Sequence, residues 1–417
     1  MKSFLSPHFT TKNSACFIAI LFLCRSYWLT AQTSAPSGIF ADTIYHCVKL
    51  TSDVVYGSNY NPFYNQVDTL KLDTYEPNAT IDYLRPLIIY AHGSFKGGDK
   101  TGDKALAFGN YFAKCGYLYA SIDYRLYIDD STDTIDNFQG VYMATQDAKS
   151  AVRFFRKHAG DYCVDTSMIF MIGTSAGGAV CLTSAYWDQE EADQIFNTTE
   201  WGPLENSSGN EGYSSRLTAI VSCWGGIPDT SWLRNEKTPN QLFHGTDDPS
   251  VPYMWGLSGN GVHLFGGYTI HEASIADHIE SYLHPFVGAG HGVRSDVPQF
   301  DTLLQISTDF LYNHLKNDEG TTHCNYSSDN PSMCGEDVIL ISTLNEDQLL
   351  ILNTASGPFA GTLRIYSLSG SIMLNSEITI ASGSSTQVDC SSFASGCYLV
   401  EIQSESLRKV SKVFLKE

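Results

Sequence analysis

Met168-Ile169-Phe170-Met171-Ile172-Gly173-Thr174-Ser175-Ala176-Gly177-Gly178 joins a predicted strand to a predicted helix through a glycine-rich turn. The five apolar residues 168–172 are typical of a strand buried on both faces, and residues 179–186 predict a helix. A Gly-x-Ser-x-Gly motif in this context forms a tight turn, because residues larger than glycine on either side of the serine would collide with neighbouring elements. The motif therefore predicts that Ser175 is a nucleophile.

Apolar runs and helical stretches alternate along the chain on both sides of this motif. Helical spacing of apolar residues predicts helices over 137–159 and 302–315. Further strands are predicted at 70–75, 86–91, 117–122, 219–223, 241–243 and 282–287. This alternation predicts an α/β fold in which a mostly parallel sheet is covered by helices on both faces.

A serine nucleophile of this kind needs a carboxylate and a histidine, which follow it along the chain in that order. Asp247 and Asp248 follow the predicted strand 241–243, where a loop can turn one carboxylate toward a base. Seven histidines follow Asp248, and His291 is the one that lies between two glycines. These positions predict His291 as the general base and one of the two aspartates as its partner.

The tetrahedral intermediate of such a reaction carries a negative oxygen, which backbone N–H groups stabilise. One donor is expected from Ala176, the residue after the nucleophile. The other is expected from the loop 92–99, which follows a predicted strand and contains small residues. Within this loop Ser94 is preferred, and Gly93 or Phe95 is the alternative.

The composition describes a folded, acidic protein. The 417 residues include 25 Lys and Arg against 45 Asp and Glu, for a formal charge of −20, and 43% are hydrophobic. A strongly negative surface disfavours nucleic acid as a partner, because a polyanion is bound through a positive field. No Cys/His spacing indicates a zinc site, and the predicted serine chemistry requires neither a metal nor an organic cofactor.

The N-terminal residues 1–31 have the features of an export signal. Two lysines precede an apolar run at 15–24, and Ala31 offers a small residue for cleavage. No later segment has eighteen uninterrupted apolar residues, so no transmembrane helix is expected. An oxidising compartment permits disulfides, and pairs such as Cys390 with Cys397 would close short loops.

The residue composition changes twice after the α/β pattern begins. Residues 188–215 are polar and predict an excursion between core elements, of the kind that is usually functional or mobile. Residues 317–337 are rich in turn formers and predict a linker. Short alternating strands without a helical period then predict a small all-β domain over 338–417. The expected order is a signal at 1–31, an α/β domain at 32–316, the linker and the β domain.

Four motifs make residues 45–316 resemble an α/β-hydrolase of the carboxylesterase and lipase type. They are His92-Gly93, Gly173-Thr174-Ser175-Ala176-Gly177-Gly178, His244-Gly245-Thr246-Asp247-Asp248-Pro249-Ser250-Val251-Pro252 and Gly290-His291-Gly292. The resemblance implies a triad of Ser175, Asp248 and His291, and it prefers Asp248 over Asp247. Asp123-Tyr124-Arg125-Leu126 also resembles this class, in a structural or a functional role. The usual His-Gly-Gly-x-Phe is one residue short here, which leaves the second oxyanion donor open.

The β domain resembles the C-terminal sorting domain of type IX secretion in Bacteroidetes. The resemblance rests on residues 363–370, on residues 391–400 and on Lys412-Val413-Phe414. It implies that the N-terminal signal takes the chain to the periplasm. It also implies that the tail engages the secretion machinery for passage to the cell surface or the medium. A carbohydrate-binding or cell-adhesion module is the alternative for this domain.

These expectations describe a secreted serine esterase that acts on a small-molecule or polymer-linked ester. Two alternatives share the fold, a polysaccharide-directed acetyl or feruloyl esterase and a serine peptidase. Peptidases that resemble this fold usually carry an added β-propeller, for which the chain has no room. A third alternative is a surface-displayed binding protein without turnover, which the filled triad positions disfavour.

Overall fold

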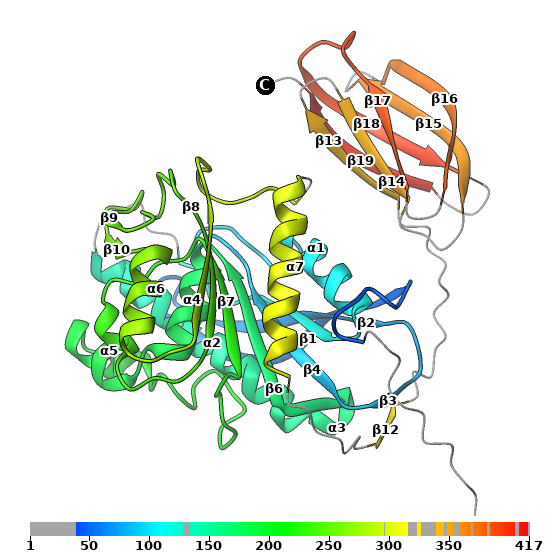
Figure 1. The fold of residues 1–417 in the computed structure, drawn as a ribbon. Helices are drawn as coiled ribbons and strands as arrows, with labels where there is room; N and C mark the ends of the chain where they lie inside the picture. The colour runs from blue at the N-terminus through cyan, green and yellow to red at the C-terminus, as the bar shows by residue number, and fades with distance from the viewer. Residues whose placement is uncertain are drawn as a thin grey trace, which may run out of the picture. The chain divides into compact units, whose positions relative to one another are not determined.

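The computed structural model describes residues 39–127, 134–295, 297–315, 323–326, 339–345, 348–353, 358–367, 370–381, 384–404 and 408–415. The predicted export signal, 1–31, lies outside these ranges. The described residues form an N-terminal α/β body and a C-terminal β body (Figure 1). Each body has a hydrophobic core of its own.

An eight-stranded sheet forms the centre of the N-terminal body (Figure 1). Its strands are β1 (Val48–Asn61), β2 (Gln66–Pro77), β4 (Arg85–Ala91), β5 (Leu118–Ile122), β6 (Val164–Thr174), β7 (Ala219–Cys223), β8 (Asn240–Gly245) and β11 (Ser281–Phe286). They lie in the order β1-β2-β5-β4-β6-β7-β8-β11. Strand β2 runs antiparallel to both of its neighbours, and every pair from β5 to β11 is parallel. The predicted α/β fold with a mostly parallel sheet is thus confirmed.

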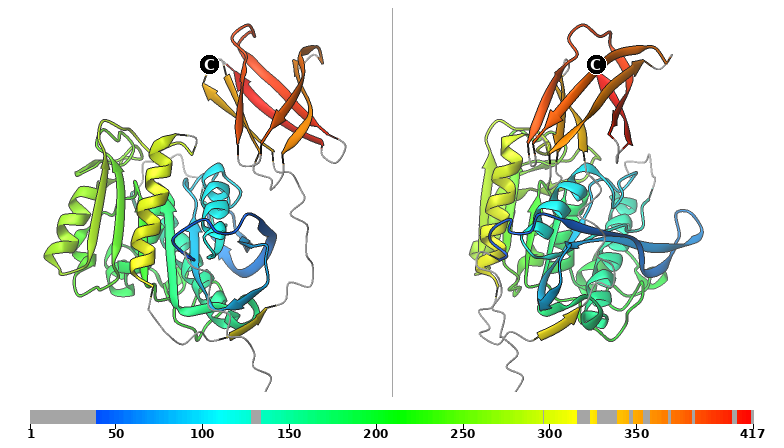
Figure 2. Two further views of the ribbon diagram at one scale, coloured as in Figure 1. Left: turned by 45° about the vertical axis from the view of Figure 1, so that its right-hand side comes forward. Right: turned by 90° about the vertical axis from the view of Figure 1, so that its right-hand side faces the viewer.

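Helices cover both faces of this sheet, as the views in Figure 2 show. They are α1 (Asp103–Lys114), α2 (Thr134–Lys157), α3 (Ala159–Tyr162), α4 (Ala176–Tyr186), α5 (Gln189–Ile195), α6 (Gly267–Ala276) and α7 (Pro298–Asn313), with 3₁₀ turns at Thr199–Trp201 and Thr230–Leu233. Successive side chains of a strand point to opposite faces. In β4, Leu87 and Ile89 join a core with α2 and α4, whereas Ile88 and Tyr90 join a core with α1 and α7. Within the described ranges, no helix has the length and apolar character needed to cross a membrane.

Two short sheets accompany the main one. Strands β9 (Trp255–Leu257) and β10 (His263–Phe265) form an antiparallel pair. Strands β3 (Ile81–Tyr83) and β12 (His323–Tyr326) form the other antiparallel pair. Strand β12 falls inside the predicted linker 317–337, so part of that segment extends the N-terminal body by a strand.

The polar excursion 188–215 is anchored to helix α2. Arg153 donates hydrogen bonds from its guanidinium to the carbonyl oxygens of Ser207 and Gly209. The hydroxyl of Ser150 donates to the carbonyl oxygen of Ser208 at 2.9 Å. Ser207 and Ser208 are buried by these contacts. The excursion is therefore a packed part of the body.

The C-terminal body is built from two antiparallel sheets. Its strands are β13 (Ile339–Asn345), β14 (Gln348–Asn353), β15 (Phe359–Ser367), β16 (Ile372–Ile380), β17 (Ser385–Asp389), β18 (Gly396–Gln403) and β19 (Arg408–Leu415). One sheet has the order β13-β14-β17 and the other the order β16-β15-β18-β19. Apolar residues of both sheets share one core. These two sheets confirm the prediction that the C-terminal domain is small and all-β.

Some of the described cysteines are disulfide-bonded and others are free thiols. Cys47 and Cys163 each take part in a disulfide. Cys390 is a buried free thiol, so the short loop expected from a Cys390–Cys397 pair is not closed. The free thiols Cys181 and Cys223 are buried in the core, where desolvation raises the pKa of both. A buried thiol with a raised pKa is a poor nucleophile, so these side chains act as core residues.

Candidate active site

The turn between β6 and α4 holds Ser175 in a strained conformation. Its backbone φ is 54°, a region that non-glycine residues rarely adopt. A Cβ on Gly173 would collide with the carbonyl of Gly177, and a Cβ on Gly177 would collide with the carbonyl of Ala91. Both motif glycines are therefore required by close backbone approach, as the sequence pattern predicts.

The structure brings the three predicted triad side chains together from three separate loops. The Oγ of Ser175 lies 2.8 Å from Nε2 of His291. The Nδ1 of His291 lies 2.7 Å from Oδ2 of Asp248. Asp247, the other candidate, instead accepts a hydrogen bond from the hydroxyl of its neighbour Thr246. A continuous relay of hydrogen bonds thus runs from Ser175 to Asp248.

Asp248 is held as an anion by N–H donors. Its side chain is fully buried. Burial alone would raise the pKa of this carboxyl group, but hydrogen bonds from His244, His291, Val251 and Ser250 outweigh burial and hold the pKa well below its usual range. A carboxylate that stays ionised can hold the His291 ring in one orientation and stabilise its protonated form during the reaction.

The predicted oxyanion donors lie on two sides of Ser175. Ala176 begins helix α4 and lines the same cavity as Ser94. Ser94 has a positive φ of 71°. Among the residues that the structure describes, neither of these two backbone N–H groups has a protein acceptor. Gly93 packs against the carbonyl of Thr174, so the loop lies close to the nucleophile.

A buried histidine fixes this loop. The Nδ1 of His92 donates to the carbonyl oxygen of Gly93 at 2.9 Å, and its ring stacks on Tyr124 with centroids 4.1 Å apart. Burial lowers the pKa of His92 to about 4, so the ring is neutral at physiological pH. The C=O and N–H of a trans peptide point in opposite directions. By holding the Gly93 carbonyl, His92 turns the Ser94 N–H the other way.

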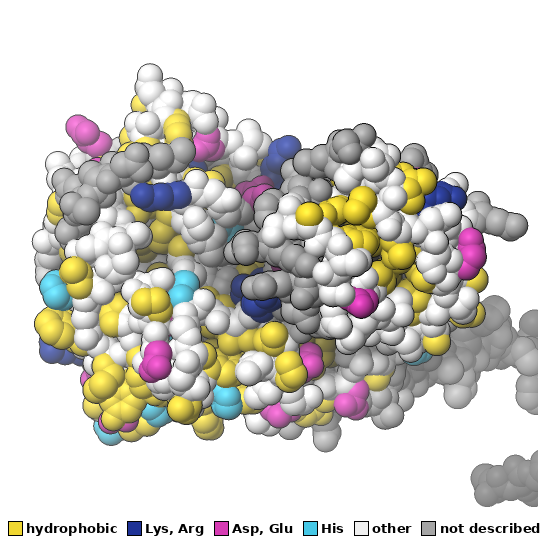
Figure 3. Space-filling model, turned by 90° about the horizontal axis from the view of Figure 1, so that it is seen from above, with side chains coloured by type: hydrophobic (Ala, Val, Ile, Leu, Met, Phe, Trp, Pro, Cys, Tyr) yellow, Lys and Arg dark blue, Asp and Glu magenta, His cyan; other side chains and the backbone are white. Residues whose placement is uncertain are grey.

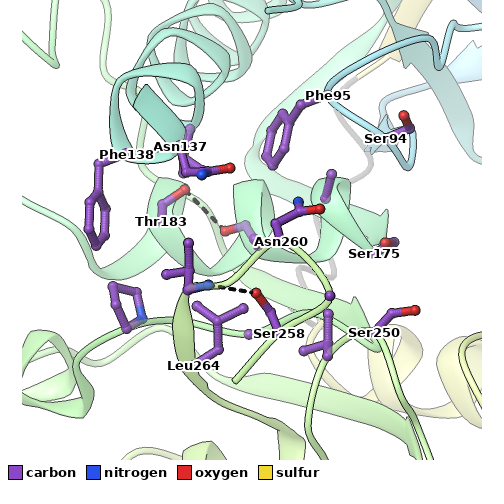
Figure 4. Close-up of a pocket in the computed structure, with 18 of the residues that line it drawn as sticks. Ser94, Phe95, Asn137, Phe138, Ser175, Thr183, Ser250, Ser258, Asn260 and Leu264 are labelled. Carbon is purple, nitrogen blue, oxygen red and sulfur yellow. Dashed lines mark hydrogen bonds between the residues drawn. The ribbon is translucent and has the colours of Figure 1, made fainter. Parts of the chain in front are cut away.

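Two cavities meet at Ser175 and His291. The first has a volume of about 520 Å³, and its walls include five aromatic side chains, Phe95, Tyr127, Phe138, Trp187 and Trp232. Figure 4 shows Phe95 and Phe138 on one side of it and the β9–β10 segment with Ser258 and Leu264 on the other. The two residues Trp187 and Trp232 stack with centroids 5.0 Å apart. This cavity can hold a bulky apolar group next to Ser175.

The second cavity is more polar. It has a volume of about 410 Å³, and its walls include Asp99, Asp103, Lys104 and Trp224. The ammonium group of Lys104 lies 5.8 Å from the centre of the Trp224 ring, within the range of a cation–π contact. Ser175 and His291 are thus flanked by one aromatic and one polar cavity, which suits the two halves of an ester.

The sequence motifs contain His92 and His244 but assign neither residue a role in the site. Each precedes a glycine at the end of a parallel strand, and that shared position is the signal for such a role. Of the aromatic residues that follow the elbow, Trp187 lines the first cavity and Trp224 the second. The described ranges contain no cluster of three or more Cys, His, Asp or Glu side chains that could hold a metal ion.

The face of the molecule seen in Figure 3 bears scattered charges. Acidic side chains are spread singly over it, among hydrophobic and neutral side chains. The described side chains of this face therefore form no concentrated acidic patch.

Two family models match parts of this chain. The family model BD-FAE matches residues 72–237, and the model of the secretion system C-terminal sorting domain matches residues 345–416. No curated protein matches the chain. Among solved structures, Thermogutta terrifontis esterase 2 phosphorylated by paraoxon is 22% identical, with a TM-score of 0.47 over 65% of this chain and 96% of that one. The propionate-bound form of the same esterase is 22% identical, with a TM-score of 0.47 over 68% and 98%.

The two matched regions fall in the two bodies of the structure. The first includes the elbow with Ser175, and the second spans most of the C-terminal strands. The resemblances to an α/β-hydrolase and to a sorting domain are both confirmed. The chain therefore carries a BD-FAE esterase domain of the α/β-hydrolase fold, followed by a secretion system C-terminal sorting domain, and it is an esterase exported to the cell surface or the medium.

Proposed function

We propose that this protein hydrolyses carboxylic esters through a covalent acyl-enzyme formed on Ser175. The observation that carries the proposal is the relay from Ser175 through His291 to Asp248, with hydrogen bonds of 2.8 and 2.7 Å, at the edge of a 520 Å³ cavity. A serine, a histidine and a buried carboxylate in this order form a nucleophile, a base and the group that orients the base.

The first half of the reaction forms the acyl-enzyme. The Oγ of Ser175 attacks the ester carbonyl carbon while Nε2 of His291 takes the hydroxyl proton. The backbone N–H groups of Ala176 and Ser94 stabilise the negative oxygen of the tetrahedral intermediate. Collapse of this intermediate breaks the bond to the alcohol, which leaves with the proton from His291.

The second half returns the enzyme to its starting state. A water molecule attacks the acyl carbon while His291 accepts one of its protons. The second tetrahedral intermediate then releases the carboxylic acid and returns the proton to Ser175. Asp248 stays ionised throughout and stabilises the protonated His291 ring. No step in this sequence requires a cofactor.

An aromatic acyl group is the substrate class that we favour. BD-FAE is a family of bifunctional acetyl and feruloyl esterases, and an acetyl or feruloyl ester on a polysaccharide is one of the alternatives that the sequence leaves open. The stacked pair Trp187 and Trp232, together with Phe138, supports a flat ring in the first cavity. The second cavity would then receive the alcohol.

The test uses the full chain after removal of the export signal. Initial rates are measured with p-nitrophenyl acetate, butyrate, octanoate and palmitate and with methyl ferulate, alongside Ser175→Ala. Rapid hydrolysis that depends on Ser175 supports the esterase, and preference for methyl ferulate supports the aromatic acyl group. A fluorophosphonate probe that fails to label Ser175, together with no turnover above Ser175→Ala, would favour a binding protein instead.

Substituting Ala179 is expected to narrow the acyl range. Ala179 lies on α4 and lines the first cavity. In Ala179→Leu the larger side chain fills part of this space, so kcat/KM for methyl ferulate and octanoate should fall by about tenfold or more. The acetate ester is the internal control, because its two-carbon acyl group occupies the least of this cavity, and its rate should stay within about twofold. Equal losses on all esters would place the acyl group outside this cavity.

We propose that residues 338–417 form the sorting domain and that the catalytic domain extends through β12. Deletion of 338–417 is expected to abolish export in a host with type IX secretion while leaving hydrolysis intact. Activity is measured in the medium, on intact cells and after lysis. Activity that appears only after lysis supports the assignment, whereas unchanged activity in the medium would contradict it. A chain cut at 316 would lose β12 and its pairing with β3.

A further inference from the structure

A second histidine contacts the catalytic carboxylate. His244 is the fifth residue of β8, and its side chain is fully buried. Its Nε2 lies 3.4 Å from Oδ2 of Asp248 and 3.0 Å from the carbonyl oxygen of Val251. The proposed mechanism gives this residue no part, although its ring lies beside the same carboxylate oxygen as His291.

The proton of His244 is placed by its surroundings. The backbone N–H of Gly267 donates to Nδ1 of His244 at 3.1 Å. An imidazole nitrogen that accepts a hydrogen bond carries no proton, so the single proton of the neutral ring lies on Nε2. That N–H faces the carbonyl of Val251 and the carboxylate of Asp248 together.

The carboxylate of Asp248 receives donors on both oxygens. Its Oδ1 accepts backbone N–H bonds from Ser250 at 2.8 Å and from Val251 at 3.0 Å. Its Oδ2 faces His291 at 2.7 Å and His244 at 3.4 Å. Val251 is held at both ends, because its N–H contacts Asp248 and its carbonyl contacts His244. The turn that carries the catalytic carboxylate is thus closed by His244.

We propose that His244 is a positioning residue, which uses its Nε2–H to lock Asp248 and the turn at residues 248–251 so that Oδ2 faces His291. It acts through Asp248 and never contacts the substrate. The inference rests on the triad proposed above. A donor at the Nε2 position is the essential feature, and the acceptor at Nδ1 only fixes the tautomer.

Two substitutions separate the donor from the acceptor. The amide nitrogen of glutamine reaches the place of Nε2, so His244→Gln keeps a donor toward Asp248. Asparagine reaches only the place of Nδ1, so His244→Asn keeps an acceptor for Gly267 and loses the donor. We expect His244→Asn to lower kcat by about 10-fold to 100-fold with KM within about twofold, and His244→Gln to stay within about threefold of the wild type.

A double-mutant cycle with Asp248→Asn tests whether His244 acts through the carboxylate. Asp248→Asn alone should lower kcat by about 10⁴-fold. If His244 acts through Asp248, adding His244→Asn to this variant should change kcat by less than about twofold. A role in folding alone would multiply the two losses instead. His284→Asn is the matched control, because His284 contacts Phe243 and Phe286 and not the triad, and its kcat should not change.

The outcomes distinguish failure of the proposed triad from failure of the proposed role of His244. Wild-type kcat in Asp248→Asn would overturn the triad itself. An impaired Asp248→Asn combined with a silent His244→Asn, or with multiplicative losses, would overturn only the role of His244. Thermal unfolding of each variant shows whether it is folded. Should His244→Asn not fold, His244→Gln decides, since a tenfold loss of kcat in that variant would contradict the proposal.

Discussion

Replacing Ser175 by alanine is expected to lower kcat for p-nitrophenyl acetate by about 10⁶-fold while the protein stays folded. The acyl-enzyme cannot form without the Oγ atom that lies 2.8 Å from His291. Residual hydrolysis would come from the oxyanion donors and from substrate binding alone. The measurement is kcat at saturating substrate, with labelling by a fluorophosphonate probe as a second readout.

A matched serine on the same strand controls for this experiment. Ser167 lies on β6, is exposed, and donates its hydroxyl to Asp165 at 2.7 Å. Ser167→Ala should keep wild-type kcat and probe labelling. If Ser175→Ala instead retains more than about one hundredth of the wild-type rate, a group other than Ser175 acts as the nucleophile. The proposed acyl-enzyme on Ser175 would then be wrong.

The central elements could be predicted because local patterns determine them. The strand at 168–172 and the helix at 179–186 follow from apolar runs, and the glycines between them follow from close backbone contacts that leave no room for a Cβ. His291 was identifiable because it lies in a glycine-rich loop after a predicted strand. The choice between Asp247 and Asp248 needed the resemblance, since both follow β8 and only the fold decides which one turns inward.

The supporting residues could not be predicted because their roles depend on distant partners. The tautomer of His244 is set by an N–H from Gly267, which begins α6 after an intervening hairpin. His92 acts through the carbonyl of its own neighbour and through stacking on Tyr124. Strand β12 is four residues long, and its partner β3 lies near the start of the chain. A short strand in a polar segment has no periodicity that a sequence pattern could detect.

Arg125, in the motif Asp123-Tyr124-Arg125-Leu126, has a structural role. Its side chain is buried and lies 2.9 Å from Oδ1 of Asp147 on α2. It also donates to the carbonyl of Tyr60 on β1 at 2.6 Å, and Ser208 of the polar excursion donates to the same carboxylate at 2.5 Å. Neither Arg125 nor Asp147 lines the two cavities beside Ser175. One ion pair therefore ties β1, the loop after β5, α2 and the excursion together.

Breaking this ion pair is expected to have the largest effect on stability. Asp147→Asn leaves the Arg125 guanidinium buried without a counter-charge, which costs about 3–5 kcal/mol of unfolding free energy. That cost should lower the thermal midpoint of the N-terminal body by about 10 °C. Below the transition, kcat should stay near the wild-type value, because neither partner touches the triad. The measurement is the loss of esterase activity and of tertiary circular dichroism on heating.

A carboxylate with a mostly exposed side chain provides the control for this prediction. Asp53 lies 3.5 Å from Lys71 and 3.3 Å from Lys100, and its side chain is 60% exposed. Its positive φ of 59° suits asparagine as well as aspartate, so Asp53→Asn removes charge without backbone strain. Lys100 keeps its buried partner Asp73 at 3.0 Å. Because ion pairs of an exposed carboxylate contribute little to stability, the midpoint of this variant should not move measurably. Equal shifts in Asp53→Asn and Asp147→Asn would mean that loss of charge alone destabilises the protein. A shift confined to Asp147→Asn would assign the effect to the buried guanidinium of Arg125.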